Sequence, residues 1–385
     1  MKRYGNLFEK ICSMDNLVQA HQNAKANKGW YKEVKMVDAD PEYYLGELQK
    51  MLLNHTYQTS EYEKFIKKEG KKEREIFKLP YYPDRICQWA IMQVIEPIML
   101  KHFTSDTYSA IPGRGPHECK MNLVNAIQHD VPGTQYCLKL DAKKFYPSIS
   151  HDILKQKFRR LFKDDELLWL LDEIINSIST CPATPENVKF YEQFGEVKIV
   201  THKDGTKVID GVGIPIGNYL SQYSGNLYFA EFDHWIKEVK HVKYYYRYMD
   251  DIVILAGSKE ELHQLLKEID VFFKTNLHLR IKENWQVFPT FVRGVDFVGY
   301  RTFLNYQLFR KSTCKSMKTK MTTINKKRLS GKELNFSEWC SINSYKGCLK
   351  HCDSYRLSQK YIAPIQPFAD SYYNQKIKKK GGKKV

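Results

Sequence analysis

Residues 244–256 read Tyr-Tyr-Tyr-Arg-Tyr-Met-Asp-Asp-Ile-Val-Ile-Leu-Ala. Aromatic and apolar residues that favour strands flank two adjacent carboxylates, Asp250 and Asp251, which predicts a tight β-hairpin with an acidic tip. Two ionised neighbours repel each other, so folding alone gives little reason to place them there. A bound divalent cation would remove the repulsion. The tip is therefore either an ordinary acidic turn or part of a metal site, and the rest of the chain must decide.

The elements predicted around this hairpin indicate an α+β fold. A strand is expected over residues 136–141, and it ends in a third acid, Asp141. The other expected elements are helices over 151–162, 164–178, about 216–239 and 258–276, a strand over 279–288 and a hairpin over 291–303. This order is typical of a split β-α-β arrangement on an antiparallel sheet, in which Asp141 can meet Asp250 and Asp251 on adjacent central strands.

The segments outside this centre differ in character. Residues 1–60 are predicted to be helical, and Asp40 is expected to cap a helix that has Pro41 at its first position. Residues 61–80 predict a basic hairpin, after which Asp84 is expected to cap an apolar helix. The remaining predictions are a polar, β-prone insertion over 182–209, a helical basic segment over 305–370 and a disordered basic tail over 371–385.

The composition points to a polyanionic partner. The 385 residues include 61 Lys and Arg against 44 Asp and Glu, a net charge of +17. Such an excess is typical of nucleic-acid binding, although a generally basic surface would also produce it. The sequence has no apolar run of about 18 residues and no signal peptide at its start, so we expect a cytoplasmic protein without a membrane partner. Its nine cysteines are expected to be reduced.

Three carboxylates on one sheet can hold two magnesium ions. Such a pair of ions activates an attacking hydroxyl and stabilises the leaving oxygen in phosphoryl transfer. Asp141, Asp250 and Asp251 would meet this need, because magnesium favours a few carboxylates together with substrate phosphates. The acids alone do not decide between synthesis of a nucleotide polymer and hydrolysis of a phosphodiester.

Several segments together resemble the reverse transcriptases, in the order in which that family has them. Asp141-Ala-Lys-Lys-Phe-Tyr146-Pro-Ser-Ile resembles the first catalytic motif, and Tyr248-Met-Asp-Asp251 resembles the second. Arg74 and Lys78, with Asp84-Arg85-Ile86, resemble the fingers segment, and Gly294-Val-Asp-Phe-Val-Gly-Tyr300 resembles the primer-grip hairpin. The resemblance covers roughly residues 60–305 and implies a right-hand polymerase. Its parts would be fingers over 61–135, a palm over 136–304 that contains the insertion, and a thumb over 305–370.

The resemblance also implies roles for individual residues. Asp141, Asp250 and Asp251, with the carbonyl of Ala142, would bind two Mg²⁺ ions, for which Mn²⁺ can substitute. Tyr146 occupies the steric-gate position that excludes a ribose 2′-hydroxyl. The other residues implied to bind the nucleotide are Arg74, Lys78, Ile216, Gly217, Gln222 and Lys282. Those implied to contact primer or template are Tyr248, Met249, Phe297, Gly299 and Tyr300. Lys311, Lys315 and Lys318 fall on one face of the predicted basic helix, which could follow a phosphate backbone or be a solvated helix face. The implied substrates are a template RNA, a DNA or RNA primer and dNTPs.

Plainer interpretations stay open for most of these residues. Arg74 and Lys78 could be solvated hairpin charges, and Arg74 lies one residue further from Asp84 than the family pattern has it. Tyr146 could be a buried aromatic, and Lys282 an ordinary strand lysine. The chain as a whole could bind a template without catalysis, an alternative that three intact acids disfavour.

One segment indicates a subgroup. Most reverse transcriptases carry Gln-Gly-x-x-x-Ser-Pro where this chain has Ile216-Gly-Asn-Tyr-Leu-Ser-Gln222, a form similar to that of diversity-generating retroelements. That resemblance implies an error-prone enzyme that works with a small basic accessory protein. Asn125-Ala-Ile-Gln-His129 instead resembles retron enzymes, so a retron-like or stand-alone antiphage reverse transcriptase is the alternative.

Overall fold

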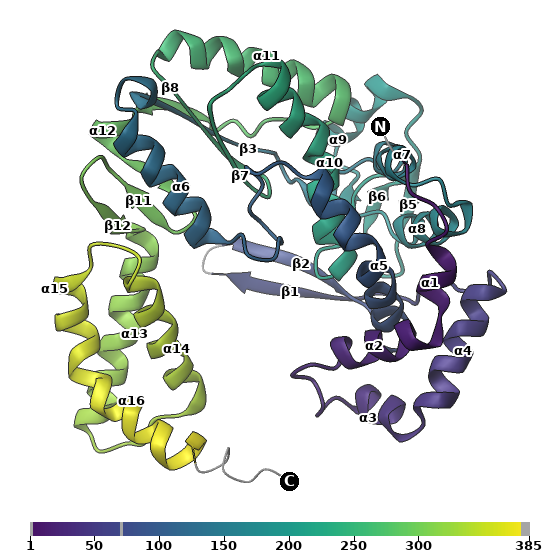
Figure 1. Ribbon diagram of the computed structural model, residues 1–385, viewed down its shortest axis with the longest axis horizontal. Helices are drawn as coiled ribbons and strands as arrows, with labels where there is room; N and C mark the ends of the chain where they lie inside the picture. The colour runs from purple at the N-terminus through teal and green to yellow at the C-terminus, as the bar shows by residue number, and fades with distance from the viewer. Residues whose placement is uncertain (1–2, 70–71, 379–385) are drawn as a thin grey trace. The chain divides into compact units, whose positions relative to one another are not determined.

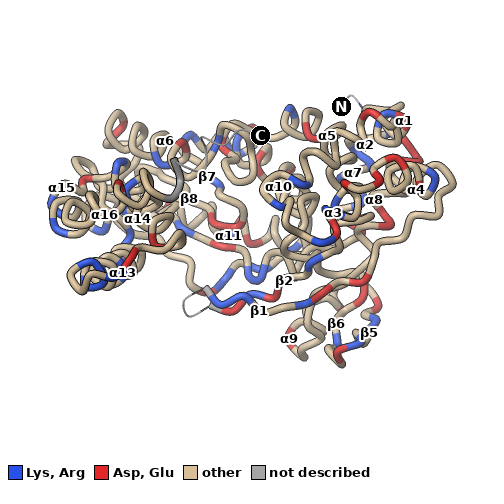
Figure 2. Tube along the Cα trace, turned by 90° about the horizontal axis from the view of Figure 1, so that it is seen from below, with Lys and Arg blue, Asp and Glu red and all other residues tan. Residues whose placement is uncertain are grey.

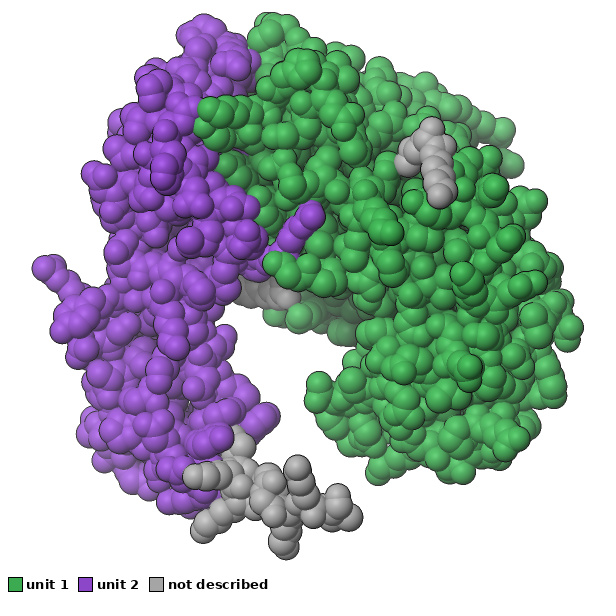
Figure 3. All heavy atoms as spheres, viewed as in Figure 1, with its two compact units in different colours: residues 1–113, 139–252, 264–285 green, residues 114–138, 253–263, 286–385 purple. Residues whose placement is uncertain are grey.

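The computed structural model describes residues 3–69 and 72–378. The chain divides into two compact units, which Figure 3 colours separately. Unit 1 comprises residues 1–113, 139–252 and 264–285, and unit 2 comprises residues 114–138, 253–263 and 286–385. Helices and strands are both abundant, as an α+β fold requires (Figure 1). None of the helices in the described residues combines the length and the apolar character needed to cross a membrane.

Unit 1 contains most of the helices and the first hairpin. Its helices are α1 (Phe8–Cys12), α2 (Met14–Ala24), α3 (Lys32–Ala39), α4 (Pro41–Leu53), α5 (Ile86–His102), α7 (His151–Leu161), α8 (Asp165–Asn176), α9 (Pro185–Tyr191) and α10 (Tyr219–His234). Its strands are β1 (Glu63–Glu69), β2 (Lys72–Lys78), β4 (Cys181–Pro182), β5 (Ile199–Thr201), β6 (Lys207–Ile209) and β7 (Tyr244–Tyr248). The elements β3 (Tyr136–Asp141), β8 (Asp251–Ala256) and α11 (Lys259–Leu277) are shared between the two units.

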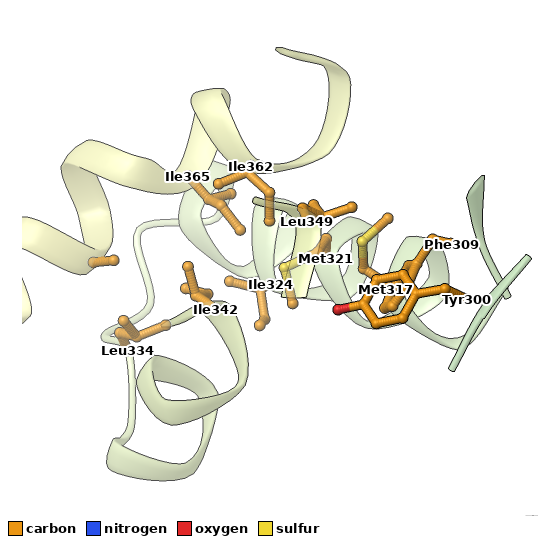
Figure 4. Packing of buried hydrophobic residues seen from close by; sticks show 11 residues of the cluster. Tyr300, Phe309, Met317, Met321, Ile324, Leu334, Ile342, Leu349, Ile362 and Ile365 are labelled. Atoms are coloured by element: carbon orange, nitrogen blue, oxygen red, sulfur yellow. The ribbon is translucent and has the colours of Figure 1, made fainter. Parts of the chain in front are cut away.

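Unit 2 contains the C-terminal elements. Its helices are α6 (Pro116–His129), α12 (Thr290–Arg293), α13 (Lys311–Leu329), α14 (Phe336–Leu349), α15 (Tyr355–Leu357) and α16 (Gln366–Tyr372). Its strands are β9 (Gln286–Pro289), β10 (Val295–Phe297), β11 (Tyr300–Thr302) and β12 (Gln307–Phe309), and the last three form one antiparallel sheet. A core that includes Met317, Ile324, Ile342 and Ile365 holds α13 and α14 to the last helices (Figure 4).

The central sheet confirms the arrangement expected for the acids. Its strand order is β7-β8-β3-β9, so the strand that follows the acidic tip pairs with the strand that ends in Asp141. The tip itself is a two-residue connection, and Met249 adopts a φ of 57°, in the left-handed region that tight hairpin turns use. The hairpin predicted from residues 244–256 therefore forms, and its acids face a neighbouring strand.

Two predictions near the N-terminus also hold. The Asp40 carboxylate accepts a hydrogen bond from the Tyr43 N–H and caps α4, with Pro41 in the first turn. Leu45, Leu48 and Leu52 form the buried face of this helix. Strands β1 and β2 pair in antiparallel register as the predicted basic hairpin. Its turn residues, 70–71, lie outside the described residues.

Asp84 does not cap a helix, which corrects the prediction. The helix α5 begins at Ile86 without a side-chain cap. Asp84 is instead fully buried, and its Oδ1 accepts hydrogen bonds from the Tyr57 hydroxyl at 2.9 Å and the Ser60 N–H at 3.0 Å. The carboxylate satisfies donors from the segment before the hairpin and not those of its own helix.

Three further boundaries differ from the prediction. The insertion contains the helix α9, which starts at Pro185 after a Thr184 cap, so it is not β-structure throughout. The strand expected over 279–288 is limited to β9, because the Trp285 N–H donates to the Lys282 carbonyl in a turn. The tail expected to be disordered from residue 371 is instead helical through residue 378. Within this tail, Tyr373 stacks on Trp339 with ring centroids 6.1 Å apart. Residues 379–385 lie outside the described residues.

Candidate active site

A large cavity in unit 1 gathers many of the predicted site residues. Its volume is about 930 Å³. The predicted residues that line it are Arg74, Tyr146, Ile216, Gly217, Gln222, Tyr248, Met249, Asp250 and Asp251. They come from β2, from the segment after β3, from the loop before α10 and the first turn of that helix, and from the β7–β8 hairpin around its tip. Sequence segments that are far apart thus supply acids, a cation and an aromatic ring to one space.

Asp141 and Asp250 interact directly. The Ala142 N–H donates to the Asp250 carbonyl at 3.3 Å, which ties the tip to the end of β3. Burial raises the pKa of Asp250 to about 7, and the charge of Asp141 and a hydrogen bond to it add to the increase. Asp251 raises the same pKa slightly further. Asp250 therefore lies close enough to Asp141 and Asp251 to be affected by the charge of both.

Two lysines lie beside Asp251 and Asp141. Lys139 Nζ lies 3.4 Å from Asp251 Oδ1, and Lys282 Nζ lies 3.3 Å from Asp141 Oδ2. The Lys282 N–H also donates to the Asp141 carbonyl at 2.9 Å, so backbone and side chain place this lysine beside the acid. Sequence reasoning did not find Lys139. Its position two residues before Asp141, on the same face of β3, was the available signal.

The acids can be tested for their fit to a metal ion. Asp141 Oδ1 is buried, and no amide, hydroxyl or ammonium group among the described residues donates a hydrogen bond to it. A bound cation would satisfy this oxygen and remove the repulsion that raises the pKa of Asp250. In the described parts of the chain, no three His, Cys, Asp or Glu side chains are already arranged around a metal position. These carboxylates fit Mg²⁺, which binds a few protein carboxylates and completes its shell with phosphates and water.

Tyr146 lies beside the acidic tip. Its hydroxyl donates to Met249 Sδ at 3.4 Å, and its ring packs near Phe145, with centroids 5.4 Å apart. Burial raises the pKa of Tyr146, and the charge of Asp250 raises it further, so the phenol stays protonated. A neutral, half-buried ring therefore forms part of the cavity wall next to the acids.

The loop before α10 is held against β2 through its backbone. The Phe77 N–H donates to the Ile216 carbonyl at 3.0 Å. Gly217 follows with a φ of +122°, and a Cβ there would lie 3.1 Å from Ile76 Cγ2 and 3.3 Å from the Phe77 carbonyl oxygen. Only glycine meets both conditions without strain. Gln222, in the first turn of α10, also reaches the cavity.

The two basic residues of β2 that were predicted to bind the nucleotide differ in position. Arg74 lines the cavity. Lys78 is absent from the described lining, and its Nζ pairs with Glu63 Oε2 at 3.1 Å on the exposed surface of the hairpin. The structure therefore brings Arg74, but not Lys78, to the acids.

The remaining predicted residues belong to unit 2. Phe297 and Tyr300 are buried there, and the Tyr300 hydroxyl donates to the Cys348 carbonyl at 3.0 Å. Gly299, with a φ of +93°, forms the turn between β10 and β11. Figure 2 shows lysines and arginines along α13, the helix that carries Lys311, Lys315 and Lys318. Lys311 and Lys315 are exposed, whereas Lys318 lies with its Nζ 5.9 Å from the centroid of the Tyr361 ring.

Comparison with known proteins identifies the family. Residues 66–302, more than half of the chain, match the family model described as reverse transcriptase (RNA-dependent DNA polymerase). The chain is similar to Protein YkfC of Escherichia coli (strain K12), with 22% identity over 257 residues that cover 58% of this chain and 61% of that protein. It is also similar to the mitochondrial Nuclear intron maturase 1 of Arabidopsis thaliana, with 23% identity over 93 residues, 24% of this chain and 12% of that protein.

Solved structures give weaker likenesses. Telomerase from Candida albicans, in complex with a fragment of telomeric RNA, superposes with a TM-score of 0.48 and 11% identity over 86% of this chain and 65% of that one. Apo telomerase from Candida tropicalis gives the same TM-score and identity, over 88% and 64%. The chain spans less than two thirds of the length of each of these relatives. The assignment therefore rests on the family model, which agrees with the motifs around Asp141 and Asp250. The chain belongs to the reverse transcriptase (RNA-dependent DNA polymerase) family.

Proposed function

We propose that this protein copies a template RNA into cDNA, using dNTPs and a DNA or RNA primer. The observation that supports this proposal is the grouping of Asp250, Asp251, Tyr146 and Arg74 on one cavity, with Asp141 close enough to raise the pKa of Asp250. Acids for divalent cations, a guanidinium for phosphate and a ring beside the sugar position are the groups that a bound dNTP needs.

The proposed roles follow from these positions. Asp141, Asp250 and Asp251, with the Ala142 carbonyl, would hold two Mg²⁺ or Mn²⁺ ions. When bound, such ions stabilise the charge that develops on the attacking and leaving oxygens. The primer 3′-hydroxyl attacks the α-phosphorus of the dNTP, forming the new P–O bond and releasing pyrophosphate. Lys282, beside Asp141, is the candidate proton donor to pyrophosphate.

Several parts of the chain would contact the template and the primer. In this proposal β1 and β2 belong to the fingers, residues 136–304 to the palm and residues 305–370 to the thumb. The exposed lysines of α13 would contact the phosphate backbone of the template–primer duplex. Tyr248 and Met249 would lie below the primer end, and the turn at Gly299 would support the primer strand. Phe297 and Tyr300 are buried, so they would hold that turn in place.

Primer extension tests the proposed activity. The full chain is incubated with a primed RNA template, the four dNTPs and Mg²⁺, and the product is sized after digestion of the RNA. We expect magnesium-dependent DNA that extends to the template end. Absence of a DNA product with both Mg²⁺ and Mn²⁺ would overturn the proposal.

Arg74 and Lys78 should differ in their effect on nucleotide binding. Charge-assisted hydrogen bonds to a phosphate contribute about 1.5–3 kcal/mol, so Arg74→Ala should raise the KM for dNTP roughly 10- to 100-fold. Lys78→Ala is the matched control: Lys78 lies on the same strand as Arg74 but pairs with Glu63 across the hairpin, so its KM should stay near the wild-type value. Steady-state primer extension at varied dNTP measures both. Equal effects of the two substitutions would refute the assignment of Arg74.

Within this activity, we propose that the enzyme belongs to the diversity-generating group. The support is Ile216-Gly-Asn-Tyr-Leu-Ser-Gln222, whose first and last residues both line the cavity. The apolar Ile216 side chain can pack against a nucleotide but cannot hydrogen-bond it, which relaxes selection. This reading implies a small basic accessory protein and errors concentrated at template adenines. Errors spread evenly over the four template bases would favour the antiphage or retron-like alternative.

Ile216→Gln should lower the error rate of the enzyme. One additional hydrogen bond to the correct nucleotide contributes about 1 kcal/mol, which corresponds to about fivefold fewer misincorporations. Ile216→Leu keeps an apolar side chain of the same size and should leave the error rate unchanged. Deep sequencing of cDNA made by the three proteins on one template provides the comparison. The hypothesis fails if Gln and Leu give the same error rate as the wild type.

A further inference from the structure

The arginine before the acidic tip is buried in the core of unit 1. Arg247, on β7, and Asp233, on α10, both have side chains with 0% exposure and form an ion pair. Removing two charges from water costs free energy that their mutual attraction does not reliably return. Apolar residues of the same volume would fill this space at least as well. Stability of the fold therefore does not explain why a buried ion pair stands at this place.

Every N–H donor of Arg247 has an acceptor. Nε and Nη2 donate to the two carboxylate oxygens of Asp233, and Nη2 also donates to Thr107 Oγ1 at 3.3 Å. The two protons of Nη1 point the other way, to Asn226 Oδ1 at 3.1 Å and to the Met249 carbonyl at 3.0 Å. Nε and Nη2 are thus bonded to the core, and Nη1 bonds both to the core, at Asn226, and to the hairpin tip, at the Met249 carbonyl.

The core side of this network is itself fixed. The hydroxyls of Thr107 and Tyr245 donate to the Asp233 carboxylate, and Asn226 Nδ2 donates to the Ser109 carbonyl at 2.7 Å. These partners come from the segment after α5, from α10 and from β7, all within unit 1. Arg247 therefore presents its Nη1 from a position that three separate elements define.

The bond to the Met249 carbonyl acts on Asp250. The peptide group is planar, so fixing this carbonyl also fixes the N–H and the Cα of the next residue. Met249 has a φ of 57°, a conformation that most residues with a side chain avoid and that the contact helps to hold. A second backbone contact also holds this tip, because the Ala142 N–H donates to the Asp250 carbonyl at 3.3 Å.

We propose that Arg247 is a positioning residue for the acidic tip: it sets the orientation of the Met249–Asp250 peptide and thereby the position of the Asp250 carboxylate beside Asp141. This inference rests on the proposed function, because it assigns the buried pair to the metal-binding acids. It predicts that loss of the Nη1 contact weakens metal binding and slows the chemical step, with a smaller effect on dNTP binding.

Arg247→Lys tests the inference. Lysine keeps a positive charge for Asp233 but lacks the guanidinium fork that also reaches the Met249 carbonyl. Mn²⁺ binding to the full chain without substrates, measured by electron paramagnetic resonance, should weaken at least about fivefold. In primer extension, kcat should fall roughly 10²-fold, the half-saturating Mg²⁺ concentration should rise, and the KM for dNTP should change by less than about threefold.

Tyr245→Phe is the matched control. Tyr245 is equally buried and donates to the same Asp233 carboxylate, but it contacts no atom of the tip in any described bond. This variant should melt at a lower temperature and keep the wild-type Mn²⁺ affinity and kcat. Mn²⁺ binding weakened as much as in Arg247→Lys would show a general loosening of the core and would overturn the inference.

A double variant covers the case in which Arg247→Lys does not fold. Asp233→Leu combined with Arg247→Met removes both buried charges, and it should fold yet show the same loss of Mn²⁺ affinity. Wild-type Mn²⁺ affinity in either folded variant would overturn the inference. So would failure of both variants to fold, because the pair would then be a requirement of folding. A wild-type chain that binds Mn²⁺ but makes no DNA would count against the proposed function alone.

Discussion

Asp250→Asn should abolish RNA-templated primer extension and leave the protein folded. Asparagine has the shape of aspartate but no negative charge, so it cannot replace a carboxylate ligand of Mg²⁺. Removal of a single preorganised donor from an active site costs about 10²–10³ in kcat, and we expect a loss of at least roughly 10³-fold here. Primer extension under single-turnover conditions, with enzyme in excess over primer, measures the loss.

The same substitution should stabilise the protein when no metal is present. Asp250 is forced close to Asp141, and the raised pKa of Asp250 reflects that unfavourable contact. The variant should therefore melt at a higher temperature than the wild type in EDTA, and Mg²⁺ should stabilise the wild type more than the variant. Asp204→Asn, on the exposed β5–β6 turn, is the control and should retain activity. Magnesium-dependent DNA synthesis by Asp250→Asn would contradict the metal-site assignment.

Tyr146→Ala should allow the enzyme to incorporate ribonucleotides. The ring forms the cavity wall beside Asp250, where it would collide with a 2′-hydroxyl on the incoming sugar. A pocket wall discriminates against one additional hydroxyl by about 10², so loss of the ring should reduce dNTP-over-NTP selectivity by about that factor. The ratio of kcat/KM for a matched dNTP and NTP pair measures the effect.

Tyr146→Phe separates the ring from its hydroxyl. The variant loses the 3.4 Å hydrogen bond to Met249 Sδ but keeps the ring, so dNTP selectivity should stay within about threefold of the wild type. If Phe relaxes selectivity as much as Ala does, the hydroxyl and its contact with the tip would be responsible. If neither substitution changes selectivity, Tyr146 is only a packing residue.

The sequence alone predicted the centre of the molecule well. The two runs of strand-favouring residues around Asp250 and Asp251 indicate the hairpin, and the β-α-β order places Asp141 on the strand beside it, as the sheet order confirms. These predictions succeed because strand periodicity and turn composition are local properties. Gly217 is indicated only by the family motif, because the close approach to β2 that requires a glycine there is a tertiary contact.

Predictions that depended on tertiary partners were less successful. Asp84 has the composition of a helix cap, but the Tyr57 hydroxyl and the Ser60 N–H compete for its carboxylate and bury it. The sequence predicts that Arg247 lies in a strand, but nothing local indicates that its partner is Asp233 on the preceding helix. Lys78 follows the family pattern, yet a cross-strand acid, Glu63, holds its ammonium on the surface. Long-range pairing of polar groups leaves little periodic signal in a sequence.

The link between Phe77 and Ile216 has a consequence for how such an enzyme can evolve. The hydrogen bond joins two backbone groups, and Gly217 supplies the close approach, so the attachment of this loop to β2 does not depend on which side chain stands at position 216. If position 216 sets copying accuracy as proposed, that accuracy can change by substitution at one position while the attachment of the loop to β2 is kept.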